Sequence, residues 1–255
     1  MINLAYIKEF NVISVLICVY NGESYIKETI NSLLLQTYKD FEILVIVNCT
    51  NDSTIKILED FNDNRIKIFQ TNICQLSYNL NYGLMKSNSK YVVRIDADDI
   101  AEPTRIEKQF KFIEDNNFDV VGSNVELIDE YGKFIGEKKY PEDNIDIRKK
   151  IFYTNPLAHP TIIYKKSTIL KVGGYMNGKV SEDYDLWLRL MRDKKIKFYN
   201  MQEKLTLYRI HTNQARGNKL AYYEICGYMI RETFYQKSFK FFIGFLVYLA
   251  KSIIK

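Results

Sequence analysis

Three carboxylates gather at Asp96, Asp98 and Asp99, directly after the apolar residues 91–95. The β-branched residues of that run predict a buried strand, and ligands of open α/β sheets bind beyond the carboxyl ends of the strands. Neighbouring carboxylates repel one another unless a cation offsets their charge. Mg²⁺ and Mn²⁺ prefer oxygen ligands, and Mg²⁺ commonly joins carboxylates to the phosphates of a substrate. The cluster therefore indicates a metal and phosphate site.

The acidic cluster also has other interpretations. Asp98 or Asp99 could cap a helix that the pattern predicts over residues 104–114, since aspartate is a common N-cap. A calcium-binding EF-hand loop is excluded, because its fifth and sixth positions would be Ile100 and Ala101. These supply neither the oxygen ligand nor the glycine that such a loop needs. Residues 96–99 alone do not decide between a metal site and a helix cap.

Strands and helices alternate with short loops through the first half of the chain. This order is typical of a parallel, doubly wound α/β unit. Neither GxGxxG nor GxxxxGKS/T follows the first strand, which argues against a dinucleotide-binding Rossmann protein and a P-loop nucleotidase. The predicted strands are residues 12–20, 41–47, 66–69 and 91–95, and the predicted helices are residues 23–36, 54–60 and 76–87.

The second half of the chain has a different order of elements. A hairpin is predicted at residues 130–132, between strands over residues 120–129 and 133–138. No internal repeat or linker separates the halves, so we expect them to share one sheet in a single large domain. The other predicted elements are helices over residues 144–152 and 183–192 and short strands over residues 161–164, 197–200 and 205–209.

The composition is that of an ordinary soluble globular protein, with 26% charged residues and a net charge of +5. Residues 1–10 lack the apolar stretch of a signal peptide, and the longest apolar run, residues 241–250, is too short to span a bilayer. Without metal-binding spacing, the cysteines are expected to be reduced, mostly buried thiols of a cytosolic protein. They are Cys18, Cys49, Cys74 and Cys226.

Further motifs accompany the acidic cluster in a fixed order: VLICVYNGE at 15–23, RIDADDI at 94–100, NPLAHP at 155–160, SEDYDLWLR at 181–189 and YRIH at 208–211. Together they resemble glycosyltransferase family 2 over roughly residues 12–213. The resemblance implies an inverting transferase with a nucleotide-sugar donor and an α/β GT-A fold, Rossmann-like, with a mixed central sheet and C-terminal helices. The implied GT-A domain spans residues 1–217, with a donor half over about 10–115 and an acceptor half over about 116–217, followed by a basic, aromatic helical tail over 218–255.

The resemblance gives the acidic residues separate roles. Asp98 and Asp96 are the expected ligands of Mn²⁺ or Mg²⁺, which neutralises the charge that grows on the diphosphate leaving group. Asp99 is a weaker candidate. Asp183 is the expected general base that takes the proton of the acceptor hydroxyl, with Glu182 in support. A helix cap is the other interpretation of Glu182 and Asp183.

The resemblance also implies a set of donor contacts. Arg209 and His211 are expected to reach the diphosphate. Arg94 is expected to contact phosphate or sugar, and His159 to stand in the wall of the site. Tyr20 could equally be a core aromatic residue. The residues expected to bind the nucleotide-sugar are Val19, Tyr20, Glu23, Asn48, Arg94, Asp96, Arg209 and His211.

One segment departs from the family pattern. The second strand commonly ends Val-Asp-Asp-Gly-Ser-x-Asp in the family, whereas this chain has Val47 and Asn48 in place of the two aspartates. One of those carboxylates typically accepts the N3 proton of uracil, and the amide of Asn48 can both accept and donate. A UDP-sugar is the expected donor, with dTDP-sugars and GDP-sugars as alternatives.

Residues 239–254 combine aromatic and aliphatic side chains with flanking lysines. Such a helix can lie in the interface of an anionic membrane, or it can dock on the core or on a second subunit of a homo-oligomer. A membrane surface at residues 237–255 is favoured, because the family often uses lipid-linked acceptors. No nucleic-acid-binding motif is present.

The expected function is transfer of a sugar to a glycan or lipid-linked acceptor in bacterial surface polysaccharide or lipooligosaccharide synthesis, in the cytoplasm or on the inner face of its membrane. A metal-dependent nucleotidyltransferase would instead release pyrophosphate. A non-catalytic binding protein of the same fold would turn over no donor. The altered residues 47–48 favour that last alternative, whereas the retained carboxylates at 96, 98, 182 and 183 argue against it.

Overall fold

The computed structural model describes residues 12–176, 178–212 and 219–254. The expectation that the chain carries no signal peptide falls on residues outside these ranges. In chain order the elements are β1 (Ile13–Val19), α1 (Ile26–Leu34), β2 (Phe41–Asn48), α2 (Thr54–Glu59), β3 (Ile66–Thr71), α3 (Leu76–Lys86), β4 (Tyr91–Arg94), β5 (Ile100–Ala101), α4 (Arg105–Asp115), β6 (Val120–Ile128), β7 (Phe134–Lys138), α5 (Asn144–Lys150), the 3₁₀ turn η1 (His159–Thr161), β8 (Ile163–Lys165), α6 (Lys166–Lys171), α7 (Glu182–Met191), β9 (Phe198–Arg209), α8 (Lys219–Gln236) and α9 (Phe239–Ile254).

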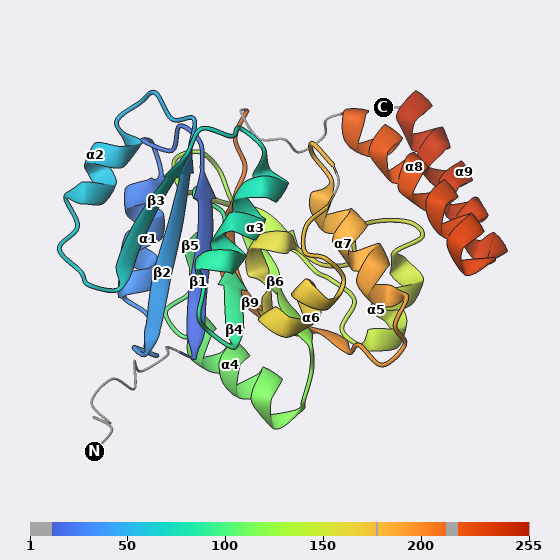
Figure 1. The fold of residues 1–255 in the computed structure, drawn as a ribbon, viewed down its shortest axis with the longest axis horizontal. Helices are drawn as coiled ribbons and strands as arrows, with labels where there is room; N and C mark the ends of the chain where they lie inside the picture. Colours follow the sequence, from blue (N-terminus) through green and yellow to red (C-terminus); the bar gives the residue numbers. More distant parts are fainter. Residues whose placement is uncertain (1–11, 177, 213–218, 255) are drawn as a thin grey trace, which may run out of the picture.

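The strands form one sheet in the order β3-β2-β1-β4-β8-β6-β9-β5, with β7 paired to β6. Strands β3, β2, β1 and β4 run parallel, whereas β8 is antiparallel to both β4 and β6 (Figure 1). Every residue of β1 and β2 is buried. Burial on both faces accounts for the continuous apolar runs over residues 15–19 of β1 and 43–47 of β2. The expected α/β fold with a mixed central sheet is confirmed.

Successive residues of β1 point into two separate cores, because the side chains of a strand alternate between its faces. Val15 joins Ile30 of α1 in one core. Leu16 joins Leu84 of α3 and Trp187 of α7 in the other. Burial of Trp187 fixes α7, the helix whose first turn carries the expected base.

The second half differs from the prediction most clearly in β9. A single strand of 12 residues replaces the two short strands predicted over residues 197–200 and 205–209. The exposed polar residues 202–204 concealed its continuity, and the pairing with β6 shifts register there. The predicted hairpin and the helices now seen as α5 and α7 are confirmed to within two residues. The short elements β5 and α6 were not predicted.

The expectation of reduced thiols is wrong for two of the four cysteines. Cys49 and Cys74 form a disulfide, with their Cα atoms 5.7 Å apart. Cys49 follows β2 and Cys74 lies between β3 and α3, so the parallel pairing of β2 with β3 brings their loops together. A spacing of 25 residues gave no indication of this pairing. Cys18 and Cys226 are free and buried, as expected.

Helices α8 and α9 pack against one another beside α7 (Figure 1). Met229 of α8 and Phe241 and Tyr248 of α9 are buried in the same core as Trp187. The inner side of the tail therefore docks on the core, and the domain boundary at residue 217 stays a prediction. Within the described ranges, every helix falls short of the length and apolar character that crossing a bilayer requires.

Candidate active site

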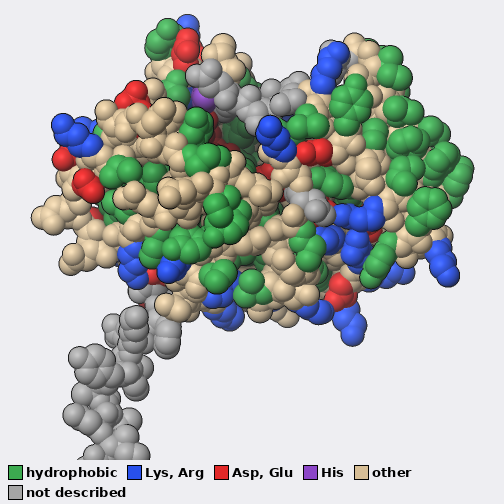
Figure 2. Space-filling view, turned by 45° about the horizontal axis from the view of Figure 1, so that its top comes forward, with side chains coloured by type: hydrophobic (Ala, Val, Ile, Leu, Met, Phe, Trp, Pro, Cys, Tyr) green, Lys and Arg blue, Asp and Glu red, His purple; other side chains and the backbone are tan. Residues whose placement is uncertain are grey.

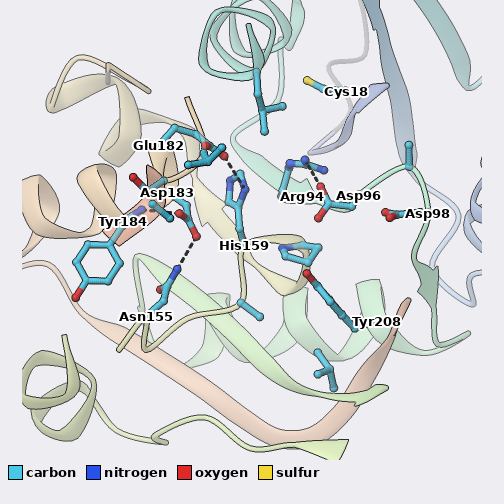
Figure 3. A pocket seen from close by; sticks show the side chains of 18 of the residues that line it. Cys18, Arg94, Asp96, Asp98, Asn155, His159, Glu182, Asp183, Tyr184 and Tyr208 are labelled. Carbon is cyan, nitrogen blue, oxygen red and sulfur yellow. Dashed lines mark hydrogen bonds and ion pairs between the residues drawn. The ribbon is translucent and has the colours of Figure 1, made fainter. Parts of the chain in front are cut away.

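A cavity of about 930 Å³ opens at the carboxyl ends of β1 and β4 (Figure 3). Its volume is in the range of small-molecule sites. Its walls come from segments far apart in the sequence: the loop after β4, the loop before η1, the first turn of α7 and the two C-terminal helices. Among the side chains that line it are Arg94, Asp96, Asp98, His159, Glu182 and Asp183.

Asp96, Asp98 and Asp99 each offer a carboxylate oxygen, and these oxygens lie within 4.8 Å of one another. Asp99 is fully buried; its Oδ1 accepts the backbone N–H of Arg209 at 2.9 Å, whereas its Oδ2 has no hydrogen-bond partner in the described part of the chain. A buried oxygen without a donor is costly, and a bound cation would satisfy it. The cluster therefore fits Mg²⁺ or Mn²⁺. None of its members caps α4, whose N-cap residue is Thr104.

Arg94 stands beside this cluster and is only 1% exposed. Its guanidinium forms an ion pair with Asp96. Burial and the charge of Asp98 raise the pKa of Asp96, and the positive charge of Arg94 opposes that rise. Arg94 thus favours the ionised form of Asp96, the form that binds a metal.

Glu182 and Asp183 begin α7 and face the cavity (Figure 3). Asn155 Nδ2 donates to Asp183 Oδ2 at 2.6 Å, and the backbone N–H of Tyr184 donates to Oδ1 at 2.7 Å. Burial raises the pKa of Asp183 to about 6 and that of Glu182 to about 8. At neutral pH Asp183 is mainly ionised and can accept a proton, whereas Glu182 holds one. The N-cap residue of α7 is Ser181, so neither carboxylate has that position.

The cavity gathers five of the residues predicted to bind the nucleotide-sugar, which are Val19, Tyr20, Arg94, Asp96 and His211. Tyr20 is exposed rather than a core aromatic residue. The side chains come from β1, the loop that follows it, β4, the loop after β4 and the segment after β9. The predicted donor site is therefore assembled from elements that the sheet brings together.

Three predicted donor residues lie outside the described lining of the cavity. Glu23 faces α2 instead, where its carboxylate accepts the backbone N–H of Ser53 at 3.0 Å. Asn48 is buried at the end of β2. Arg209 is buried under the acidic loop, where its Nε donates to the carbonyl of Asp98 at 2.8 Å and its guanidinium pairs with a glutamate of α1. Arg209 therefore supports the acidic loop, and its expected contact with the diphosphate stays a prediction.

The model of "Glycosyl transferase family 2" matches residues 14–171, more than half of the chain. The chain belongs to this family. It is 40% identical over 249 residues to the O-antigen biosynthesis glycosyltransferase WbnJ of Escherichia coli, a match that covers 96% of this chain and 98% of WbnJ. The expectation of a glycosyltransferase is thereby confirmed.

Two solved structures show the same fold as this family 2 member. One is S. aureus TarS 1–349 in complex with UDP-GlcNAc, with a TM-score of 0.72 and 18% identity over 87% of this chain and 66% of that one. The other is the mannosyltransferase PcManGT from Pyrobaculum calidifontis in complex with GDP-Man and Mn²⁺, with a TM-score of 0.63 and 14% identity over 95% of this chain and 70% of that one. The expected GT-A fold is confirmed.

His159 of this glycosyltransferase stands in the cavity wall between Arg94 and Glu182 (Figure 3). Its Nε2 shares a hydrogen bond of 2.9 Å with the hydroxyl of Tyr175, and its Nδ1 lies 3.9 Å from Glu182 Oε1. Burial and the charge of Arg94 lower the pKa of His159 well below its usual value. His159 is therefore a neutral wall residue at physiological pH.

Several other side chains line the cavity for which the sequence predicted no role. Asn155 was visible only as part of a motif, with no sign that it contacts Asp183. Tyrosines and lysines are frequent in this chain, so those that line the cavity did not stand out. They include Lys138, Tyr140, Lys179, Tyr222, Tyr248 and Lys251, and Tyr208 of the YRIH motif lies beside them.

Proposed function

We propose that this glycosyltransferase is metal-dependent and inverting, and that it acts in the synthesis of a bacterial surface polysaccharide or lipooligosaccharide. The observation that carries the proposal is that Asp98 and Asp183 line one cavity from opposite sides (Figure 3). A direct displacement needs positive charge at the leaving group and a base on the other face of the sugar. The O-antigen role in the name of WbnJ supports the choice of product.

The residues of the cavity divide the reaction between them. Asp98 and Asp96, with Asp99 beneath them, would hold Mg²⁺ or Mn²⁺. When bound, such an ion would supply positive charge to offset the charge on the departing nucleoside diphosphate. Asp183 accepts the proton of the acceptor hydroxyl as its oxygen attacks the anomeric carbon from the opposite face, which inverts that centre. Glu182 is protonated at neutral pH and so adds no second negative charge beside the base.

The proposed donor is a UDP-sugar. TarS was solved with UDP-GlcNAc and PcManGT with GDP-Man, so either base is compatible with this fold. The amide oxygen of Asn48 can accept the N3–H of uracil. Strand β2 places Val47 beside Val19, whose side chain lines the cavity. Because the family's carboxylates are missing at residues 47–48, dTDP and GDP are the alternatives to compare.

We further propose that α9 lies on a membrane surface. Hydrophobic side chains gather over the C-terminal helices in Figure 2, with Lys and Arg side chains beside them. Lys237 and Lys240 precede and begin the helix. A large exposed apolar face next to basic residues suits the interface of an anionic bilayer. The exposed apolar residues of the helix are Phe239, Ile243, Leu246, Leu249, Ile253 and Ile254.

The other side of α9 supports a lipid-linked acceptor. Tyr248 and Lys251 line the same cavity as Asp183, so a helix lying on lipid would hold the acceptor side of the cavity close to the membrane. Nucleotide-sugars are cytosolic metabolites, and the proposed location is therefore the cytoplasmic face of the membrane. A second subunit on the same apolar face is the alternative occupant.

The test is a thermal-shift series with UDP, GDP, CDP and dTDP, each with and without Mn²⁺. A ligand that binds only the folded protein raises its melting temperature. We expect a shift with UDP that needs the metal and is lost in Asp98→Ala, but kept in Asp146→Ala, an exposed aspartate of α5. Asp183→Ala should keep the shift and lose sugar transfer. Release of pyrophosphate would indicate a nucleotidyltransferase, and no shift with any nucleotide would contradict the proposal.

A further inference from the structure

We infer that Asn155 is the positioning residue for Asp183, aiming its carboxylate and favouring its ionised form. Asn155 ends a short strap, residues 151–155, which runs from α5 toward η1. The inference rests on the proposed function, in which Asp183 is the base. It adds a residue to the machinery of transfer that belongs neither to the metal loop nor to α7.

The direction of the hydrogen bond between the two side chains is set by the surroundings of Asn155. Its Nδ2 lies 2.6 Å from Asp183 Oδ2 (Figure 3). Its Oδ1 accepts the backbone N–H of Leu157 at 3.3 Å. Because a backbone N–H can only donate, the amide oxygen must face Leu157 and the amide nitrogen must face Asp183.

Each carboxylate oxygen of Asp183 accepts a hydrogen bond from an identified donor. Oδ1 accepts the backbone N–H of Tyr184 at 2.7 Å, and Oδ2 accepts from Asn155. A carboxylate has about four lone-pair positions, so these two bonds leave others for the hydroxyl of an acceptor in the cavity. Without Asn155, one oxygen loses its anchor and the carboxylate can turn about its last torsion.

The charges around Asp183 make the Asn155 bond important for ionisation. Burial and nearby carboxylates favour the protonated form, whereas the bond from Asn155 favours the ionised form. Lysines also line the same cavity, and their charge acts in the same sense as Asn155. The charged and titratable groups that line the same cavity as Asp183 include Arg94, Asp96, Asp98, Glu130, Lys138, His159, Lys179, Glu182, Tyr184, His211, Tyr248 and Lys251.

The strap that carries Asn155 is held from outside by α9. Phe152 packs on Phe241, with the ring centroids 5.0 Å apart. Lys251 Nζ donates to the carbonyl of Tyr153. These contacts hold the strap at two successive residues, Phe152 and Tyr153, so the amide of Asn155 reaches Asp183 from a supported backbone.

The first test needs neither donor nor acceptor. The carboxyl groups of ¹³C-labelled aspartates are titrated by NMR in the full-length protein with Mg²⁺ present, and Asp183→Asn identifies the signal of residue 183. In Asn155→Leu we expect the midpoint of that signal to rise by about one to two pH units, since a charge-assisted hydrogen bond is lost. Asn155→Asp keeps the shape of the side chain and should also raise the midpoint of the Asp183 signal, because a carboxyl group replaces the amide that donates to Asp183.

The matched control is Thr154→Val, a change of similar shape in the same strap, which should leave the titration of Asp183 unmoved. Midpoints that stay unchanged in both Asn155 variants would overturn the inference. If Asn155→Leu fails to fold, Asn155→Asp carries the test alone, because it keeps both the size of the side chain and an acceptor for the Leu157 N–H.

A kinetic measurement separates this inference from the proposed function. The probe is the slow release of UDP from UDP-GlcNAc with water as acceptor, followed from pH 5 to 9. In Asn155→Leu the acid limb of the rate should move to higher pH, whereas a merely structural defect would lower the rate equally at every pH. If the Asn155 variants show the NMR shift but the wild type releases no nucleoside diphosphate from any nucleotide-sugar, the result would support the Asn155–Asp183 coupling and count against the proposed function.

Discussion

His211 Nε2 and Asp98 Oδ2 lie 2.8 Å apart, although 113 positions separate the two residues in the chain. The contact joins the acidic loop after β4 to the segment that follows β9. The ring of Tyr25 lies 5.2 Å from the imidazole and holds it in place. The proposed metal ligand is therefore oriented by a residue from the opposite end of the domain.

Removal of this histidine should weaken metal binding. Loss of a side chain that orients a metal ligand typically costs 10–100-fold in metal affinity. We expect His211→Ala to raise the Mn²⁺ concentration for half-maximal activity by about that factor, with partial recovery at high Mn²⁺. The measurement is activity against free Mn²⁺. A lower rate with an unchanged Mn²⁺ dependence would show that His211 acts elsewhere.

Glu182 should make folding stability depend on pH. Burial raises its pKa from 4.5 to about 8, so the folded protein keeps a proton that the unfolded chain releases above pH 4.5. The stability due to this proton is complete below pH 4.5 and is lost as the pH rises toward 8. Glu182→Gln cannot titrate, so its free energy of unfolding should fall less between these pH values than that of the wild type. Urea unfolding at several pH values in metal-free buffer checks this, and parallel curves would contradict it.

The ion pair between the buried Asp185 of α7 and Arg231 of α8 should contribute strongly to the packing of α8 on α7. Asp185 is fully buried and accepts from Arg189 Nε at 2.7 Å and from Arg231 of α8. In Arg231→Ala, Asp185 loses one of its two cationic partners, and we expect a loss of about 2–3 kcal/mol in urea unfolding. The exposed pair of Lys149 with Asp146 provides the control, since Lys149→Ala should change stability by less than about 1 kcal/mol. If Arg231→Ala and Lys149→Ala lowered the free energy of unfolding by the same amount, the prediction that the buried pair contributes more than the exposed pair would be wrong.

The disulfide between Cys49 and Cys74 should make the thermal stability of the protein sensitive to reductant. A loop closed across 25 residues contributes about 3 kcal/mol to stability. We expect dithiothreitol to lower the melting temperature of the wild type but not that of the Cys49→Ser/Cys74→Ser double variant. Thiol titration of the unfolded, unreduced protein should find two free thiols. Four would show that the bond does not form.

The exposed side of α9 should bind anionic vesicles. Leu246→Glu/Ile253→Glu places two negative charges on the apolar face, and we expect it to abolish co-sedimentation with phosphatidylglycerol vesicles at low salt. Met85→Glu is the control, because Met85 is 79% exposed on α3, away from this face. If the wild type is instead a dimer that does not bind vesicles, and the α9 variant is a monomer, the exposed apolar face of α9 binds a second subunit.

The parallel half of the fold could be predicted because β1, β2 and β4 are buried on both faces and helices such as α1 are amphipathic. The acidic loop and the Glu182–Asp183 pair could be predicted because each lies within a short, contiguous motif. Arg209 and Glu23 lie outside the described lining of the cavity because each is held by a distant partner, the Asp98 carbonyl and the backbone of Ser53, and their donor contacts stay predictions. The same reason concealed Asn155, whose contact with Asp183 exists only after the strap folds onto α7.

The two sides of α9 limit how enzymes of this design can be recombined. One side is apolar and exposed, and the other holds the strap that ends at Asn155. A chimera that imports a foreign α8–α9 pair to change the acceptor would also replace the support of the base. The module to exchange is therefore the helical pair together with residues 151–155, and a chimera built without the strap should keep donor binding while its turnover falls.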